Sequence, residues 1–486
     1  EDFSEDEEQL WLDRGVQPFQ LASLDEEVTT VRTLWSALRI SAAGRSEVLA
    51  FHDADAFENL EFRVAFALWR LTTGERPEVA FVSDTPRLSA AEAHQYFQTQ
   101  GLIAPLGKDV YSTAREALSA VDFSVHHLDS RSPEQAGHFD ALVWLQPRRP
   151  VGRVLPLLAE HLYRGGGALV AAQHFNMQAR QFRGRGFDFV HWPQPQSNDL
   201  GLFYLPELGI RLVREVLFDE LNLPITDEAQ LNASDRRDFR TMQSSLPFVI
   251  RAVGAHFNSE SPITRGLGDQ AFIWPSAVQV DQERLDQLGL TATTLISTSE
   301  HSWSFNWVGG YLPPDGQPEL FEGPAPGPGG EPAFEGQKAL MIDVQGTFPW
   351  PEYAFRAAES LGAPGAQGPS PTDEQALVVP PYPVKEPVGE GAVGRLLLVG
   401  SSELFKSDRL VDLRPEYRGD QLLLNSVADL VLPTGLSQLM ARRPVARGFD
   451  APAENDRLQW RALVLLAAPA AYLLLGLGRR LLRGAA

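Results

Sequence analysis

The chain has 486 residues, long enough for two or more domains with cores of their own, and its 43% hydrophobic and 22% charged residues are typical of a folded protein. Its formal net charge of −21 at pH 7 repels phosphate backbones, so we expect no nucleic-acid partner. The chain contains no cysteine, which excludes disulfides, zinc–thiolate sites, iron–sulfur clusters and thiol nucleophiles.

Residues 1–44 form an acidic first segment, in which six of the first eight residues are Asp or Glu. Such a run of charge predicts a solvated terminus rather than a ligand site. Because the sequence begins at Glu1 and not at methionine, we expect a further segment to precede it. A signal peptide, a membrane helix and a whole domain all remain open for that segment.

Strand and helix patterns alternate from residue 45 onward. Short apolar runs predict strands at Val48–Phe51, Val79–Val82, Val121–Leu128, Ala141–Leu145 and Ala168–Ala172. Helices are predicted between them at Phe57–Leu71, Ser89–Gln100 and Val151–Tyr163. This β-α-β order predicts an α/β fold with a mostly parallel sheet and helices on both faces, flavodoxin-like or Rossmann-like.

The alternation weakens over residues 174–245, which we interpret as a loop-rich insertion with one helix around Val213–Leu221. A first α/β domain over residues 45–311 then ends with three further predicted strands, at Phe248–Val253, Phe272–Val280 and Thr293–Ser297.

A linker rich in proline and glycine follows at residues 312–337. A second α/β portion covers residues 338–440 and contains another Pro/Gly-rich stretch at 362–390. Its predicted elements are strands at Ala339–Val344 and Arg395–Val399 and helices at Pro351–Leu361 and Gln421–Leu430.

The clearest physical signal lies at the C-terminal end. Ala462–Gly478 carries no charge, and a helix of this length spans roughly 26 Å, close to the thickness of a bilayer core. After a juxtamembrane segment at 441–459, we predict a transmembrane helix over residues 460–483 that contacts lipid. Its anchoring residues are an interfacial tryptophan, a proline and a tyrosine within the span, and three arginines at its end: Trp460, Pro469, Tyr472, Arg479, Arg480 and Arg483.

The arginines follow the span and acidic residues precede it, so the positive-inside rule predicts a cytoplasmic C-terminus and an extracytoplasmic body. The span and its orientation predict a location in the bacterial inner membrane with a periplasmic body, and the absence of cysteine suits an exported bacterial protein. A C-terminal core helix buried inside the protein is the alternative.

Polar residues follow most of the predicted strands, where ligands bind in doubly wound sheets. The positions are Asp53–Asp55, Ser83–Thr85, Gln146, Gln173–Asn176 and Ser401–Glu403. The candidate ligand or partner surface consists of Gln173, His174, Asn176, Ser401, Ser402 and Glu403. Since none of these positions completes a catalytic motif, we predict no catalytic residue, no metal and no cofactor.

Two glycine-containing motifs have structural readings. Gly400–Leu404 follows a strand as a nucleophile elbow does, but a leucine stands where that motif needs its second glycine. We interpret Ser401 and Ser402 as capping residues of a turn, with a catalytic serine as the alternative. Gly165–Gly167 comes after a helix and before a strand, the opposite of a dinucleotide-binding loop, and indicates helix termination.

Three other groups of side chains each allow a functional and a structural interpretation. The histidines fit no spacing of metal ligands, and individual roles are expected for His126, His127, His161, His174 and His191. A basic cluster, either a docking patch or a solvated loop, is formed by Arg180, Arg183 and Arg185. Aromatic faces for a sugar or lipid, or for local packing, are offered by Trp303, Trp307 and Tyr311.

A family resemblance rests on four segments in a fixed order. They are Phe139–Val143 with Gln146-Pro147 and Arg164–Val170; Ser261–Leu267, of the form P-I-T-x-G-L; Thr294–Ser299 with Ser302-Trp303; and Gly394–Ser402 with Leu424–Leu430. Together with the terminal apolar run and its arginines, they resemble GldG-like auxiliary proteins of ABC-type transport systems associated with gliding motility. The resemblance covers roughly residues 45–486.

The resemblance implies a fold akin to class I glutamine amidotransferase domains, without an amidotransferase active site. It also implies two partners, a multi-span ABC permease and a cytoplasmic ATPase subunit. Our hypothesis is therefore a non-catalytic, membrane-anchored extracytoplasmic subunit that contacts the permease, a substrate or an envelope partner. A membrane-anchored serine hydrolase and an envelope module that binds sugar or lipid are the alternatives.

Overall fold

A computed structural model describes residues 5–13, 16, 18–25, 28–50, 60–83, 110–129, 137–147, 154–183, 187–195, 200–226, 243–312, 318–350, 391–412 and 417–442. The chain divides into two compact units, Glu1–Arg443 and Pro444–Ala486, and every described residue lies in the first.

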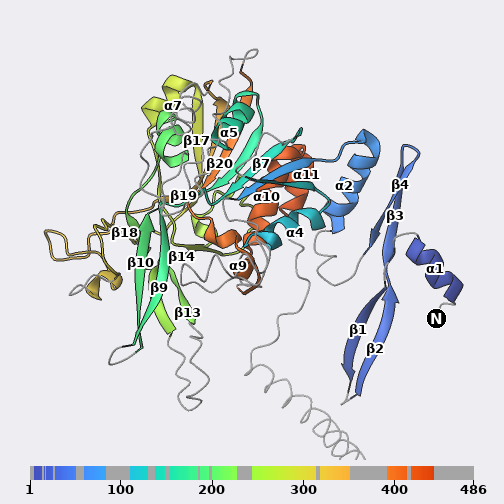
Figure 1. Cartoon of the computed structure of the whole chain (residues 1–486), viewed down its shortest axis with the longest axis horizontal. Coiled ribbons are helices and arrows are strands. Elements are labelled where there is room, and N and C mark those ends of the chain that lie inside the picture. The colour runs from blue at the N-terminus through green and yellow to red at the C-terminus, as the bar shows by residue number, and fades with distance from the viewer. Residues whose placement is uncertain are drawn as a thin grey trace, which may run out of the picture. The chain divides into compact units, whose positions relative to one another are not determined.

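The centre of this unit is a sheet of nine strands (Figure 1). Its parallel part consists of β5 (Glu78–Ser83), β6 (Ser124–Asp129), β7 (Ala141–Leu145), β8 (Gly167–Ala171) and β20 (Val393–Val399). These strands lie side by side in the order β6-β5-β7-β8-β20. All five residues of β7 and of β8 are buried, as expected for continuous apolar runs covered on both faces. The predicted α/β class is confirmed.

Antiparallel strands extend the sheet beyond β20. They are β19 (Ala339–Thr347), β17 (Leu290–Ser297), β16 (Val278–Val280) and β11 (Ile210–Leu212). β19 pairs with β20 from Met341↔Val399 to Thr347↔Val393, and it also pairs with β17 and β16. Residues 338–440 therefore supply two strands, β19 and β20, to the same sheet as the earlier part of the chain.

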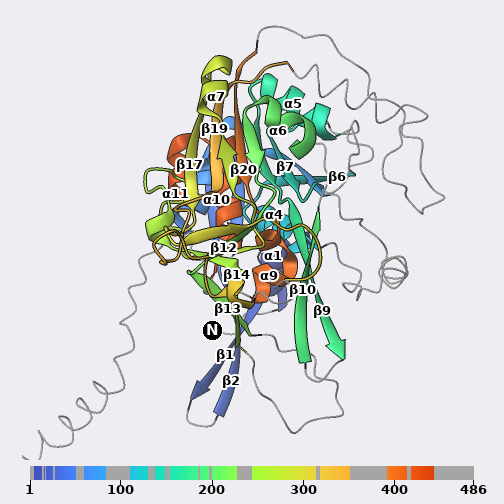
Figure 2. The same ribbon diagram turned by 90° about the vertical axis from the view of Figure 1, so that its left-hand side faces the viewer.

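Helices cover both faces of the sheet, as the two views show (Figures 1 and 2). The first face of the sheet packs against three helices, α2 (Leu60–Thr73), α4 (Ser112–Ala120) and α10 (Gly419–Val431). The second face packs against α5 (Val154–Tyr163), η3 (Leu200–Tyr204), α6 (Leu205–Glu207) and α7 (Gln282–Leu288). The side chains of β7 alternate between these two cores: Val143 and Leu145 join the first, and Leu142 and Trp144 join the second.

Tyr204, the last residue of η3, buries a hydroxyl group in the second core. The side chain is 1% exposed, and its hydroxyl has no hydrogen-bond partner among the described residues. Burial raises the pKa of Tyr204, with a smaller contribution from Glu207. We expect Tyr204→Phe to raise the free energy of unfolding by about 1 kcal/mol, because it removes an unsatisfied buried polar group.

The matched control for this substitution is Tyr111→Phe. Tyr111 is equally buried, but its hydroxyl donates to Gln146 Oε1 at 3.0 Å. Loss of this hydrogen bond is expected to lower the free energy of unfolding by about 1 kcal/mol. Urea titrations of both variants and the parent measure the two changes. A Tyr204→Phe variant that is less stable than the parent would contradict the placement of the Tyr204 hydroxyl.

A third, mainly aromatic core lies between two smaller sheets. One contains β12 (Val216–Asp219) and β18 (Ser302–Phe305), and the other contains β13 (Asn222–Thr226), β14 (Gln243–Ala252) and β15 (Gln270–Ile273). The helix predicted around Val213–Leu221 is wrong, because this segment contains β12, whose four residues are all buried. Such short apolar runs fit a buried strand as well as a helix. The strand predicted at Phe272–Val280 is two strands, β15 and β16, which belong to different sheets.

Three antiparallel hairpins complete the described strands: β1 (Pro18–Asp25) with β2 (Val28–Trp35), β3 (Ala37–Ala42) with β4 (Arg45–Ala50), and β9 (Phe175–Arg183) with β10 (Phe187–Pro195). The strand predicted at Val48–Phe51 therefore belongs to a hairpin and not to the parallel sheet. The remaining helices are α1 (Glu5–Asp13), α9 (Ser407–Asp412), α11 (Thr434–Met440) and short 3-10 turns at Gly254–His256, Pro318–Phe321 and Glu403–Phe405.

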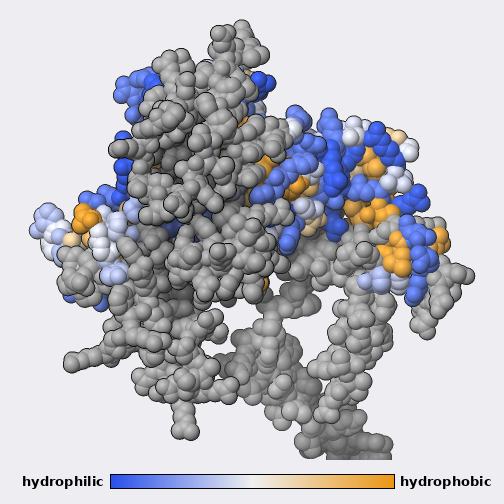
Figure 3. Space-filling view, in the orientation of Figure 1, coloured by the Kyte–Doolittle hydropathy of each residue, from blue (hydrophilic) through white to orange (hydrophobic). Residues whose placement is uncertain are grey.

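Some apolar side chains remain at the surface of the N-terminal elements. Leu10, Leu12, Leu38 and Leu68 are 45%, 44%, 40% and 41% exposed and belong to α1, β3 and α2. Figure 3 shows apolar groups among hydrophilic ones over this part of the molecule.

Several predicted elements fall outside the described residues. They are the helices at Ser89–Gln100 and Pro351–Leu361, the juxtamembrane segment from residue 443 onward and the transmembrane helix at 460–483 with all six of its anchoring residues. Within the described part of the chain, no helix has the length and apolar character needed to span a membrane.

Candidate functional site

Polar side chains converge at the carboxyl ends of three neighbouring parallel strands. The chain continues from β5 to β6 on one side and from β7 to β8 and β20 on the other, so the strand order reverses between β5 and β7. Ligands of doubly wound sheets bind at the carboxyl ends of the strands, beside such a reversal. Gln146 follows β7, Gln173 follows β8 and Ser402 follows β20, and their exposed fractions are 2%, 2% and 0%.

Hydrogen bonds connect these strand ends directly. Gln173 Oε1 accepts from the backbone N–H of Ser402 at 2.7 Å and from its hydroxyl at 3.1 Å, while Gln173 Nε2 donates to Asn176 Oδ1 at 2.9 Å. Gln146 Nε2 donates to the same Asn176 oxygen at 3.4 Å and to Glu403 Oε1 at 3.1 Å. The predicted positions Gln146, Gln173, Asn176, Ser402 and Glu403 are therefore brought together.

Glu403 brings a buried negative charge to this site. Glu403 is only 2% exposed, and the Nζ atom of Lys406 lies 2.6 Å from its Oε1 atom. An ammonium group and an amide donor together compensate the buried carboxylate without any ligand. We call the seven connected residues the strand-end network: Tyr111, Gln146, Gln173, Asn176, Ser402, Glu403 and Lys406.

Gln146 has an unusual backbone conformation for a buried residue that is not glycine. Its φ is 54°, in the left-handed region, and its N–H donates to the carbonyl of Ala171 at 2.9 Å. This conformation costs about 1–2 kcal/mol for an L-residue and persists only where its surroundings fix it. Here it aims the amide of Gln146 at both Tyr111 and Glu403.

His174 and Ser401 make their hydrogen bonds elsewhere. The backbone N–H of His174 donates to Ser276 Oγ at 2.7 Å, and the Ser401 hydroxyl donates to the carbonyl of Ile273 at 2.7 Å. Both bonds fasten the strand ends to β15 and the segment after it. Of the other predicted positions, Ser83 is buried at the end of β5, and residues 53–55, 84 and 85 lie outside the described residues.

The protonation of His174 gives a pH-dependent prediction. Burial, and secondly the charge of Arg214, lower the pKa of His174 from 6.5 to about 4. The unfolded chain therefore binds a proton between pH 6.5 and pH 4 that the folded chain does not, and stability falls as the pH falls through this range. We expect the urea midpoint of the parent to decline more steeply over this window than that of His174→Phe. Equal pH profiles, or an NMR pKa of His174 near 6.5, would contradict the prediction.

The serine hydrolase alternative gains no support from this geometry. The Ser402 hydroxyl donates to Gln173 and the Ser401 hydroxyl donates to a backbone carbonyl, and both residues are 0% exposed. A nucleophilic serine instead needs its hydroxyl aimed at a base and open to substrate. An amide oxygen and a carbonyl oxygen are not bases of the required strength.

Two of the three aromatic residues considered for sugar or lipid binding, Trp303 and Trp307, pack in the third core. Trp303 is 2% exposed, its Nε1 donates to the carbonyl of Leu320 at 3.2 Å, and its ring lies 5.5 Å from that of Phe218. Trp307 Nε1 donates to the carbonyl of Gly310 at 3.1 Å. A buried indole cannot stack on a saccharide, so Trp303 contributes to stability rather than to binding.

The histidines that the structure describes do not converge on one metal site. His161 is half-buried beside Gly167, whose carbonyl lies 3.0 Å from its Nε2, and partial burial lowers the pKa of its ring. Across the described residues no group of three or more His, Asp or Glu side chains could hold a metal ion. The side chains of Arg180, Arg183, Arg185 and His191 are outside what the structure describes.

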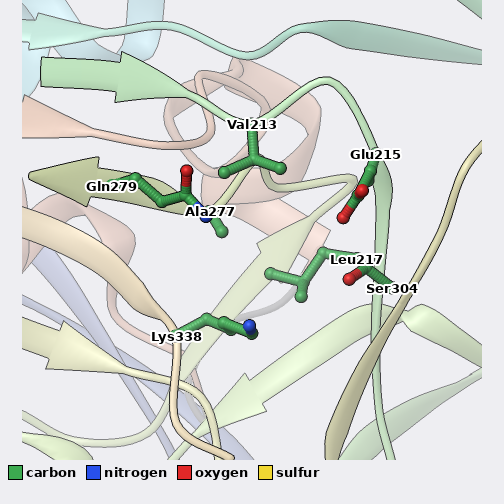
Figure 4. Close-up of a pocket in the computed structure, with 7 residues that line it drawn as sticks. All are labelled: Val213, Glu215, Leu217, Ala277, Gln279, Ser304 and Lys338. Atoms are coloured by element: carbon green, nitrogen blue, oxygen red, sulfur yellow. The ribbon is translucent and has the colours of Figure 1, made fainter. Parts of the chain in front are cut away.

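Two hollows occur away from the strand-end network. The first has a volume of about 20 Å³, and Figure 4 shows Lys338 and Glu215 directed toward it from different elements. A cavity of this size holds about one water molecule, and its polar lining suits one. The second is larger and is lined by α6, β11, β16 and α7.

Two members of the network were not expected from the sequence. Lys406 stands three residues after Glu403, a spacing that pairs opposite charges on one helical turn and could have indicated it. Tyr111 precedes α4, which was not predicted, and its sequence context carries no signal of a hydrogen bond to Gln146.

Comparison with known proteins gives one match. A family described as "ABC-type uncharacterized transport system" matches residues 76–426. No curated protein and no solved structure matches the chain significantly. The matched residues include β5 through β20 and most of α10, and hence the whole strand-end network. The chain therefore belongs to this family of ABC-type transport system auxiliary proteins.

Proposed function

We propose that this chain is a non-catalytic, membrane-anchored extracytoplasmic subunit of an ABC transport complex. The family match supports an accessory role in transport. The observation that carries the non-catalytic part is the strand-end network. Its amides, hydroxyls and one ion pair bond to one another at the place where a doubly wound enzyme would hold its ligand.

The anchoring part of the proposal rests on the uncharged run Ala462–Gly478 and the arginines after it. It is tested with a reporter that fluoresces only in the cytoplasm. A fusion after Ala486 should fluoresce, and a matched fusion after Arg442, before the span, should stay dark. A dark fusion at Ala486 would overturn the orientation. Deletion of residues 460–486 should also release the chain from washed membranes.

The partners we propose are a multi-span permease and a cytoplasmic ATPase subunit, in accord with the family. Affinity purification of the native chain in mild detergent should retain both. Recovery of the chain as a lone, water-soluble monomer from the same cells would count against the proposal. A serine-reactive activity probe provides the check on catalysis: labelling of Ser401 or Ser402 would favour the hydrolase alternative.

We also infer a flavodoxin-like fold related to class I glutamine amidotransferase domains. Numbered along the chain, the five parallel strands lie in the order 2-1-3-4-5, which is the flavodoxin-like order. The GldG-like sequence segments support the same relationship and a link to gliding motility. Loss of surface gliding in a deletion strain, restored by the intact gene, would test that link.

A further inference from the structure

A surface groove of about 360 Å³ lies at the end of the sheet formed by β11. It is lined by residues of α6, β11, β16 and α7 and of the turns between them, and its charged lining residues are Arg211, Asp281 and Arg284. Its volume falls within the range of small-ligand sites, about 300–1,000 Å³. We propose that this groove binds a compact oxyanion, a carboxylate or phosphate group, through Arg211 and Arg284.

Arg211 supplies the cation that is open to a ligand. It stands on β11 opposite Gln279 of β16 and is exposed. Within the described part of the chain, its guanidinium makes no hydrogen bond or ion pair. All five of its N–H donors can therefore bind an anion, and their planar fork matches the oxygens of carboxylate and phosphate.

Arg284 is held in position by its own helix and by α6. Its Nε donates to the carbonyl of Glu207 at 3.0 Å, and its Nη1 donates to Gln287 Oε1 at 3.4 Å. These bonds fix the orientation of the guanidinium and leave its Nη2 group available. A fixed donor binds more tightly than a mobile one, because less side-chain entropy is lost on binding.

Gly209 allows the two sides of the groove to approach each other. Its φ is 78°, and a Cβ atom there would lie 2.7 Å from the Cβ of Arg284. Its carbonyl also accepts from the N–H of Asp281 at 2.7 Å. The turn before β11 is thus joined to the start of α7, and the spacing between the arginines does not depend on mobile loops.

The charges of the groove favour an anion. Asp281 is the one acidic residue in the lining, and its carboxylate accepts from the backbone N–H of Arg284 at 3.1 Å as the cap of α7. Burial raises the pKa of Glu207, the acidic group that interacts with Arg284. The lining residues therefore carry a net charge of +1 in a chain whose net charge is −21. This site does not depend on the proposed transport role.

The test is calorimetric titration of the full-length protein in detergent, at constant ionic strength, with inorganic phosphate in one arm and succinate in the other. We expect saturable binding of at least one anion, and the arm that binds identifies the ligand chemistry. Arg211→Gln should weaken that binding about tenfold, as expected for the loss of a charge-assisted pair. Arg211→Lys, which keeps the charge but loses the fork, should fall between the parent and Arg211→Gln.

The matched control is Arg265→Gln, which removes the same charge from an exposed arginine outside the groove. It should bind the anion within about twofold of the parent, since exposed charges are screened by salt. Saturable binding of neither anion up to about 50 mM would overturn the proposal. An equal loss in Arg265→Gln and Arg211→Gln would also overturn it, because the effect would then follow net charge and not the groove.

Discussion

Replacing Arg395 by methionine is expected to lower the free energy of unfolding by about 3–5 kcal/mol. Arg395 lies on β20 between two carboxylates: its Nη2 is 2.7 Å from Asp343 Oδ2 on β19, and its Nη1 is 2.7 Å from Asp429 Oδ2 on α10. The two aspartate side chains are only 7% and 8% exposed. Methionine would fill the space of the arginine but leave both buried charges without a counterion.

The experiment measures urea midpoints, with Arg442→Met as the control. Arg442 pairs with Glu61 at 3.2 Å, but both side chains are about two-thirds exposed, at 64% and 67%. Exposed pairs contribute about 0–1 kcal/mol, so this variant should be nearly as stable as the parent. Similar losses in the two variants would show that burial does not distinguish the pairs. Adding Asp343→Asn and Asp429→Asn to Arg395→Met should restore part of the lost stability, since the stranded charges are then removed.

The sequence allowed most of the parallel strands to be predicted because β5, β7, β8 and β20 are short, largely apolar runs in the interior of the sheet. Ala141–Leu145 was predicted with the bounds that the structure has, and β8 and β20 are displaced by one or two residues at their ends. The same rule misled at Val213–Leu221, where the apolar run is a strand of a separate small sheet. Periodicity over four residues cannot distinguish a helix from a buried strand. The strand conformation of β12 depends on its pairing with β18, which lies more than 80 residues away in the sequence.

The strand-end network was predictable in part for a geometric reason. Parallel strands present their carboxyl ends at one edge, so polar residues within three positions of the ends of β7, β8 and β20 had to be neighbours. The partners of each side chain could not be predicted in this way. His174 directly follows Gln173, yet its backbone bonds to Ser276 and not to the network, because the chain there begins the β9 strand. Tyr111 enters from the start of α4, whose position depends on tertiary packing.

Gly400→Ala is expected to lower the free energy of unfolding by about 3 kcal/mol or more, through overpacking of backbone against backbone. A Cβ atom at this position would lie 2.1 Å from the carbonyl oxygen of Ser276. Two backbone hydrogen bonds, each 2.8 Å long, hold Gly400 in this position. The N–H of Ser276 donates to the Gly400 carbonyl, and the N–H of Gly400 donates to the Leu340 carbonyl. No side-chain rotation can relieve a clash with a carbonyl group, so the strand end itself must move.

That movement gives the prediction a second readout, because Ser402 follows Gly400 by two residues and bonds to Gln173. Urea midpoints should be compared with those of Gly435→Ala, at a helical glycine of α11 with no atom within 4 Å of its would-be Cβ. That control should gain about 0.4–1 kcal/mol, since alanine restricts the unfolded chain and fits the helix. Hydrogen exchange at the Ser402 amide should accelerate in Gly400→Ala and stay unchanged in Gly435→Ala. Equal stability of the two variants would mean that β20 does not end in close contact with Ser276. The position of Ser402, and with it the geometry of the strand-end network, would then be wrong.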